Sequence, residues 1–185
     1  MIEKTIMGWH VIFAGFKNVN ISDTNVFLSR IRKDVLDCQV QVFDAERIAG
    51  LDHLYFSVLN ALKADESGNK ISASLAMEIL LYASGQHQIE KAIRMLGVKP
   101  CSSQIVVVIL SKNREKSIRT MLKISKNIEG EESDEIIDFT DEKFQVLKST
   151  FEISDVELEA TLRRSKKEAL TSILIERSAL LVTQT

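Results

Sequence analysis

The residues with the most reactive side chains are few and lie far apart along the chain. There are three histidines, His10, His53 and His87, and two cysteines, Cys38 and Cys101. A metal centre needs clustered His, Cys, Asp or Glu ligands, and the chain has no HxH, HExxH or CxxC pattern. A catalytic cysteine needs a nearby base, and no nucleophile elbow surrounds either cysteine. We therefore expect packed or surface histidines, small buried cysteines and no metal site.

Phosphate-binding loops are also absent from the sequence. Such loops need glycines in series, because backbone N–H groups must approach the anion closely. The chain has seven glycines and contains neither GxGxxG nor GxxxxGK[ST]. ATP hydrolysis and kinase activity are therefore unsupported, and we predict no catalytic residue and no cofactor.

Glu78 is the one carboxylate in an otherwise apolar segment, residues 75–83. A charge among apolar side chains is costly unless it is paired or hydrogen-bonded. One interpretation is a buried acid that organises a functional site. The other, which we favour, is a structural acid that binds a helix N-terminus or a basic partner.

Two stretches of the chain are basic. The first comprises Lys112-Asn113-Arg114-Glu115-Lys116 with Arg119, Lys123 and Lys126. Its last three cations recur at helical spacing and can share one face of a helix. The second is the run Arg163-Arg164-Ser165-Lys166-Lys167. Charge runs of this kind are usually solvated faces, although a local patch for a charged partner remains open.

Composition narrows the class of protein further. The 185 residues are 45% hydrophobic with a net charge of −2, which is unlike a disordered chain or a strongly basic nucleic-acid binder. No apolar run reaches the roughly 18–20 residues that cross a bilayer, and the N-terminus lacks the pattern of a secretory signal. We predict one domain over residues 1–185, located in the cytoplasm, or also in the nucleus if the protein is eukaryotic.

Strand-like and helix-like segments alternate, and hairpin turns are largely absent. The clearest strand is 105–110, whose unbroken β-branched run favours a central strand covered on both faces. In residues 86–96 the spacing predicts a helix with Ile89, Ile93 and Leu96 facing inward. The pattern indicates a mixed α/β (α+β) fold, with a single central mixed sheet of about four to five strands covered by helices. The other predicted strands are 9–14, 40–43 and 135–139, and the other predicted helices include 51–63, 75–83, 113–127, 141–148 and one from Ser154 to about Leu181.

One block carries a family resemblance. Residues 71–89, with MEILLYASG followed by a polar stretch ending in QI, closely resemble the signature of the CGI-type subunit of the KEOPS complex. This family is also known as the PRPK-binding proteins. The segment Ile175–Leu181 resembles the family's terminal "ER-ALL" string, so the resemblance runs through the chain in order.

The resemblance implies a non-catalytic subunit of KEOPS, which makes the threonylcarbamoyl modification of adenosine next to the anticodon in tRNA. Such a subunit binds and stimulates the atypical kinase-ATPase of the complex and is linked through it to the catalytic threonylcarbamoyl transferase. It also helps to hold tRNA by the single-stranded 3′ CCA end. Two alternatives from other classes remain: a small-molecule enzyme that uses Glu78 or His87, and a protein-interaction module without RNA contact.

The resemblance also points to site residues. Arginine is common in the family where this chain has His87, and histidine is mostly neutral near pH 7, so attraction to phosphate is expected to be weaker there. For the kinase-ATPase interface, the apolar half of the last helix is one candidate and the mostly hydrophobic block 75–82 is another, with a minority of their residues at the surface. The expected RNA contacts are Lys70, Ser84, Gly85, Gln86, His87, Gln88, Lys91 and Arg94, and the expected partner contacts are Ile173, Leu174, Ile175, Leu180 and Leu181.

Overall fold

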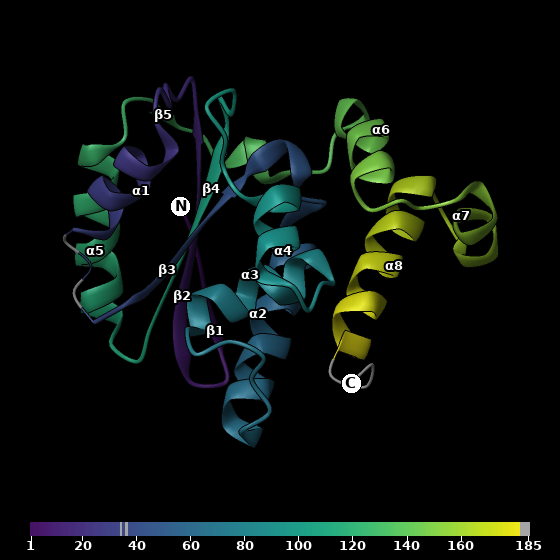
Figure 1. The fold of residues 1–185 in the computed structure, drawn as a ribbon, viewed down its shortest axis with the longest axis horizontal. Coiled ribbons are helices and arrows are strands. Elements are labelled where there is room, and N and C mark those ends of the chain that lie inside the picture. Colours follow the sequence, from purple (N-terminus) through teal and green to yellow (C-terminus); the bar gives the residue numbers. More distant parts are fainter. Residues whose placement is uncertain (34, 36, 182–185) are drawn as a thin grey trace. The chain divides into compact units, whose positions relative to one another are not determined.

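The computed structural model describes residues 1–33, 35 and 37–181 (Figure 1). The chain divides into two compact units, and each unit is built from two separate segments of sequence. Unit 1 comprises Met1–Ala45 and Gly97–Ile137, and unit 2 comprises Glu46–Leu96 and Asp138–Thr185. Among the described residues, all strands belong to unit 1, whereas unit 2 is helical.

The sheet of unit 1 has five strands, in the order β1-β2-β4-β3, with β5 paired to β2 next to β1. This confirms the predicted mixed α/β class and the number of strands. Every pairing is antiparallel, whereas we expected a mixed sheet. The strands are β1 (Ile2–Ile6), β2 (Trp9–Lys17), β3 (Gln39–Asp44), β4 (Ile105–Ser111) and β5 (Glu131–Glu132).

Strand β4 is central, as the sequence predicts. It lies between β2 and β3, and Ile109 is opposite Ile12 on one side and Val40 on the other. All seven of its residues are buried. An uninterrupted apolar strand is therefore compatible with an antiparallel sheet when both faces of that sheet are covered.

Helices α1 (Thr24–Arg32) and α5 (Arg114–Asn127) cover one face of this sheet (Figure 1). Asp23 caps α1, and the side chain of Asn113 caps α5 by accepting the backbone N–H of Lys116. Phe27 of α1 and Met121 of α5 belong to the same apolar cluster as alternate residues of β2, β3 and β4. The inner side of each helix is therefore fixed in the core, and its outer side carries the charge.

The segment 135–139, predicted as a strand, is not one. A short 3-10 helix, η2 (Asp134–Ile137), occupies most of it, and Ile136 and Ile137 are buried. The chain crosses β2 closely at Gly15, where Ser133 donates its backbone N–H to the Gly15 carbonyl at 2.8 Å. An added Cβ at Gly15 would lie 2.3 Å from the Ser133 carbonyl oxygen and 2.6 Å from Ile136 Cγ1, so only glycine permits this crossing.

A further 3-10 turn, η1 (Ala45–Arg47), joins unit 1 to unit 2 and precedes the first long helix of unit 2.

The predicted helix from Ser154 to Leu181 is divided into two helices in the structure. A capping box of Ser154 and Glu157 begins the first helix, and Ser165 caps the second by accepting the N–H of Glu168. No helix in the described part of the chain is both long enough and apolar enough to cross a bilayer. The helices of unit 2 are α2 (Gly50–Ser67), α3 (Leu75–Ser84), α4 (Ile89–Leu96), α6 (Asp141–Thr150), α7 (Asp155–Thr161) and α8 (Lys166–Leu180).

Candidate functional site

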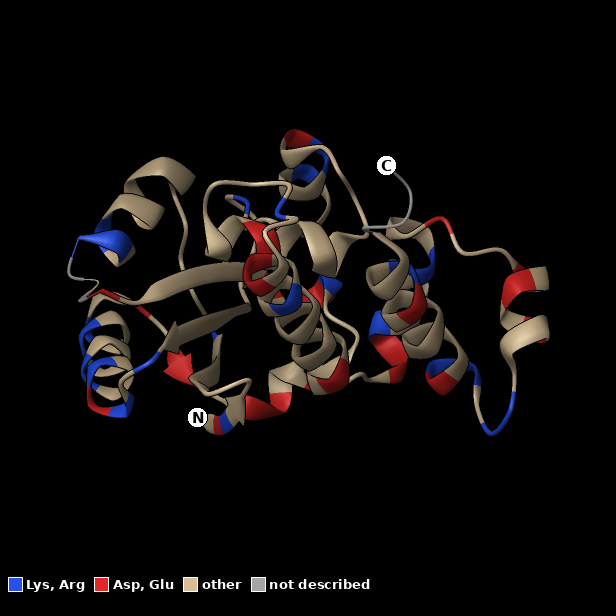
Figure 2. Ribbon diagram, turned by 90° about the horizontal axis from the view of Figure 1, so that it is seen from below, with Lys and Arg blue, Asp and Glu red and all other residues tan. Residues whose placement is uncertain are grey.

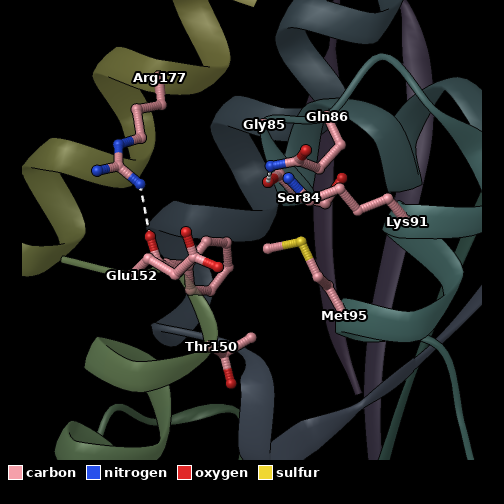
Figure 3. Close-up of a pocket in the computed structure, with 9 residues that line it drawn as sticks. Ser84, Gly85, Gln86, Lys91, Met95, Thr150, Glu152 and Arg177 are labelled. Atoms are coloured by element: carbon pink, nitrogen blue, oxygen red, sulfur yellow. Dashed lines mark hydrogen bonds between the residues drawn. The ribbon is translucent and has the colours of Figure 1, made fainter.

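Unit 2 contains a cavity of about 330 Å³ where the end of α3, helix α4, the turn after α6 and helix α8 meet (Figure 3). Its walls come from three parts of the sequence, namely 84–95, 150–152 and Arg177. The first part is more than 50 residues from each of the other two. Figure 3 shows the α3–α4 connection on one side and the turn after α6, with Arg177, on the other. The lining residues are Ser84, Gly85, Gln86, Lys91, Met95, Thr150, Phe151, Glu152 and Arg177.

Gly85 builds the first wall by ending α3 in a left-handed conformation, with φ 62° and ψ 32°. The Gly85 N–H donates to the Tyr82 carbonyl, and the Gln86 N–H donates to the Leu81 carbonyl at 3.1 Å. This pair of bonds is a Schellman motif, which turns the chain out of the helix. Gln86 is thereby placed at the cavity, where its amide Nε2 lies 3.4 Å from the Ser84 carbonyl.

His53 on α2 holds the same end of α3 from beneath. It is fully buried; its Nδ1 accepts the Ala49 N–H at 3.2 Å, and its Nε2 donates to the Ala83 carbonyl at 2.8 Å. Burial lowers the pKa of His53 to about 4, so the ring is neutral at pH 7. The expectation of a packed histidine is confirmed at this position.

Glu78 anchors the other end of α3. The side chain is fully buried, and its two carboxylate oxygens accept the N–H groups of Ile71 at 3.0 Å and Ser72 at 2.8 Å. The acid is therefore structural, as we favoured, but it orders the loop that leads into its own helix and, among the described residues, binds neither a helix N-terminus nor a basic side chain. One turn further on, burial and then the charge of Glu78 raise the pKa of Tyr82 to about 12.

The second wall is the turn that follows α6. Phe151 closes the helix by donating its N–H to the Leu147 carbonyl at 3.0 Å, and Glu152 then adopts φ 53°. A left-handed conformation is unfavourable for a residue with a Cβ, and it persists only where surrounding contacts hold it. Here the next residue, Ile153, is buried and donates its N–H to the Lys148 carbonyl at 2.9 Å.

Arg177 on α8 ties this turn to the start of α7. Its Nη1 donates to the Phe151 carbonyl at 2.7 Å, and its Nη2 donates to Glu157 Oε1 at 2.6 Å (Figure 3 shows the first bond). The backbone N–H of Ser154, and then the Arg177 guanidinium, hold the pKa of Glu157 below its ordinary value. The capping box and the cavity wall therefore form one hydrogen-bonded network.

The lining is suited to binding a ligand with polar edges. Lys91 and Arg177 are cationic, Glu152 is anionic, and Gln86 supplies an amide with both donors and an acceptor. Met95 and Phe151 add apolar surface. The lining contains neither histidine nor cysteine, so it has no obvious nucleophile with its base.

The cavity brings together four of the eight predicted RNA contacts: Ser84, Gly85, Gln86 and Lys91. His87, Gln88 and Arg94 flank them in the sequence without lining the cavity. Lys70 is not part of the group. It precedes α3, a helix about 15 Å long, and its ammonium pairs with Asp65 Oδ1 at 2.6 Å.

Helix α4 differs from its predicted orientation. Ile89 and Ile93, expected to face inward, are 40% and 45% exposed, whereas Ala92 and Leu96 are buried. The helix is only eight residues long and its buried side is correspondingly narrow. His87, just before it, is partly buried, and its Nε2 has no hydrogen-bond partner within the described residues.

The cavity residues that sequence reasoning missed are Met95, Thr150, Phe151, Glu152 and Arg177. Arg177 lies in the terminal string that supported the family resemblance, which was the one available signal. The turn 150–152 carries no motif, because its contribution depends on a left-handed residue that is not glycine.

Burial divides the five predicted partner residues on α8. Ile173, Leu174 and Leu181 are buried and therefore belong to the core of unit 2. Ile175 is partly exposed, and Leu180 is 44% exposed. Of the five, only these last two have side-chain surface that a partner could contact.

In unit 1, His10 lies between a carboxylate and a hydroxyl, an arrangement that resembles a catalytic triad. His10 Nε2 lies 2.8 Å from Glu3 Oε2, and His10 Nδ1 is hydrogen-bonded to Ser117 Oγ. Ser117 is fully buried and donates to the Arg114 carbonyl at 2.8 Å, so its hydroxyl is unavailable to a substrate. Cys38 is buried as expected, but Cys101 is exposed, contrary to prediction.

Comparison with known proteins places the chain in a family. The family described as kinase binding protein CGI-121 matches residues 16–181, which is most of the chain. The regulatory protein Cgi121 of Methanocaldococcus jannaschii is 30% identical over 127 residues, covering 68% of this chain and 79% of that protein. The match includes both walls of the cavity, and the protein belongs to the CGI-121 family of kinase binding proteins.

Proposed function

We propose that this protein is a non-catalytic subunit of the KEOPS complex, which binds and stimulates the atypical kinase-ATPase and helps to recruit tRNA through its 3′ CCA end. Family membership supports the regulatory, kinase-binding role. The observation that carries the RNA role is the cavity, which gathers Ser84, Gly85, Gln86 and Lys91 around one space.

The size and chemistry of the cavity suit a single-stranded RNA end. Its volume of about 330 Å³ is at the lower end of the roughly 300–1,000 Å³ that ligand pockets span, and it would take a group of about one nucleotide. Unpaired bases are recognised by hydrogen bonds to their edges and by contact with flat or apolar side chains. Gln86 supplies the first kind of contact, Met95 the second, and Lys91 a charge for a phosphate.

The RNA role is tested by measuring the affinity of the whole protein for tRNA with and without its CCA end. We expect trimming to weaken binding at least tenfold, because the cavity then loses its ligand. Lys91→Gln should weaken binding of intact tRNA by about three- to tenfold, as expected for one charged contact. Lys63→Gln, at an exposed lysine of α2 outside this cavity, is the matched control.

Equal affinity for intact and trimmed tRNA would contradict recruitment through the CCA end. No detectable binding of either tRNA would leave the alternative of a protein-interaction module without RNA contact. The enzyme alternative has lost its best residue, since both oxygens of Glu78 are bound to backbone N–H groups.

The kinase role is tested by co-elution with the kinase-ATPase at micromolar concentration. Among the predicted partner residues, Leu180 has the largest exposed surface, so Leu180→Asp should weaken the complex. Leu122→Asp is the matched control, since this leucine is 58% exposed on α5 in unit 1. A failure of the unaltered protein to co-elute would contradict the role, and equal losses in both variants would move the interface away from α8.

A further inference from the structure

Basic residues are concentrated on the two helices that cover the sheet of unit 1. Within their bounds, α1 and α5 carry seven cations and a single carboxylate, Glu115, although the whole chain has a net charge of −2. Figure 2 shows this concentration as blue ribbon along α5, on the left, and at the end of α1. The cations are Arg30, Arg32, Arg114, Lys116, Arg119, Lys123 and Lys126.

Neighbouring carboxylates form ion pairs with three of these seven cations. Arg30 pairs with Glu129, Arg114 with Glu3, and Lys116 with Asp37, at distances of 2.8 to 3.1 Å. Three further cations on α5, Arg119, Lys123 and Lys126, form no ion pair with any carboxylate that the structure describes. We call these three residues the basic stripe.

The basic stripe is held on a rigid support. Its members are spaced at i, i+4 and i+7, so they follow one side of α5 over about 10 Å. The opposite side of the helix is fixed by the buried residues Met121 and Ile124, and Asn113 caps its start. The charges therefore project from a surface that the core keeps in place.

We propose that the basic stripe binds the phosphate backbone of RNA, as a contact independent of base sequence and separate from the cavity of unit 2. Unpaired cations in a row attract a polyanion and release its condensed counterions. Each strand of duplex DNA carries a phosphate about every 3.4 Å along its axis, and on a similar spacing a stripe of about 10 Å spans about three phosphates of RNA.

A membrane surface fits this face less well than RNA does. Helices that lie on membranes insert a continuous apolar side among the lipids. The apolar side of α5 is already packed in the core, and Leu122 is its one large apolar residue that is more than half exposed. An acidic protein segment is the remaining competitor, and the experiment below separates it from RNA.

The test measures tRNA affinity against KCl concentration for the whole protein and for the triple variant Arg119→Gln, Lys123→Gln, Lys126→Gln. Each lost phosphate contact reduces the slope of log K against log salt by about 0.7–0.9, so we expect a reduction of about two to three. The matched control, Arg163→Gln, Arg164→Gln, Lys166→Gln, removes the same charge from the segment where α7 and α8 join. It should leave the slope unchanged.

Repeating the measurement with CCA-trimmed tRNA separates binding by the basic stripe from binding of the CCA end by the cavity. Trimming should lower the overall affinity through the cavity and leave the contribution of the basic stripe unchanged. The triple variant should therefore lose affinity by the same factor for trimmed and for intact tRNA. Equal slopes in the two triple variants would overturn the proposal, as would no detectable binding of tRNA by the unaltered protein in low salt. Displacement of tRNA by polyglutamate at equal charge concentration would overturn it in favour of an acidic protein.

Discussion

The cavity of unit 2 and the basic stripe of unit 1 both present cations, but the fold uses these cations differently. In the cavity, Arg177 is bound to Phe151 and Glu157, and the end of α3 is held by His53. In the basic stripe, the side chains of Arg119, Lys123 and Lys126 project from the helix without an ion pair to a described residue. The polar side chains of the cavity therefore help to hold unit 2 together, whereas the cations of the basic stripe make no such contribution to unit 1.

This difference has a practical consequence for any substitution. A change in the hydrogen-bonded network around the cavity should lower both the free energy of unfolding and the affinity for tRNA, because buried polar groups lose their partners. A change in the basic stripe should alter only binding and its salt dependence, because exposed charges contribute little to stability. The four predictions below test this separation, from the largest expected effect to the smallest.

Glu78→Ala should be the most destabilising change. It leaves the buried N–H groups of Ile71 and Ser72 without their acceptor, for a loss of about 3 kcal/mol in the free energy of unfolding. Urea denaturation followed by circular dichroism measures it. Glu115→Ala, an exposed carboxylate on α5, should change stability by less than about 0.5 kcal/mol. Similar losses in both variants would remove the contrast between the regions.

Acid should destabilise the protein through His53. Its pKa is about 4 in the folded protein and has its ordinary value near 6.5 in the unfolded chain, so the unfolded chain binds the proton more readily. This contribution is fully present above about pH 6.5 and is lost as the pH falls toward 4, for about 3 kcal/mol in total. Thermal unfolding between pH 7 and 4 measures it. A His53→Gln variant with the same pH dependence would show that another group is responsible.

Arg177→Ala should cost about 1–2 kcal/mol, because the Phe151 carbonyl and Glu157 both lose a charged donor. Arg177→Lys should recover only part of this loss, since one ammonium does not reproduce a planar fork with two acceptors. Arg119→Ala in the basic stripe is the comparison and should be neutral within about 0.5 kcal/mol. Chemical denaturation of the three variants gives the ranking, and a neutral Arg177→Ala would show that the network does not support the cavity.

Gly85→Ala tests the smallest effect, and its sign is informative. At φ 62° an alanine is strained, so we expect a loss of about 1 kcal/mol together with weaker tRNA binding. Glycine-to-alanine changes at compatible positions instead stabilise a protein by about 0.4–1 kcal/mol. A gain in melting temperature would therefore contradict the left-handed turn at the cavity. Gly68→Ala, at φ 74° after α2, is the matched control: it should show a similar loss of stability without an effect on binding.

Sequence patterns predicted the fold where the signal was local. The run 105–110 identified the central strand, and the predicted helix starts at 113 and at Ser154 coincide with the capping residues Asn113 and Ser154 in the structure. Strand β1 was missed because it is a short edge strand with two exposed residues, which leaves little apolar pattern. The segment 134–137 was misassigned because its conformation depends on a contact with Gly15, more than a hundred residues earlier.

The sequence by itself determined the α/β class, the absence of familiar catalytic motifs, and one wall of the cavity, because the stretch from Ser84 to Lys91 is continuous in the chain. Only the tertiary structure decided that Phe151, Glu152 and Arg177 form the opposite wall, and that Ile173 and Leu174 are core residues rather than surface. It also decided which cations are neutralised by distant acids. The physical reason is that hydrogen bonds, burial and ion pairs depend on distances in space, which spacing along the chain predicts only within single helices and turns.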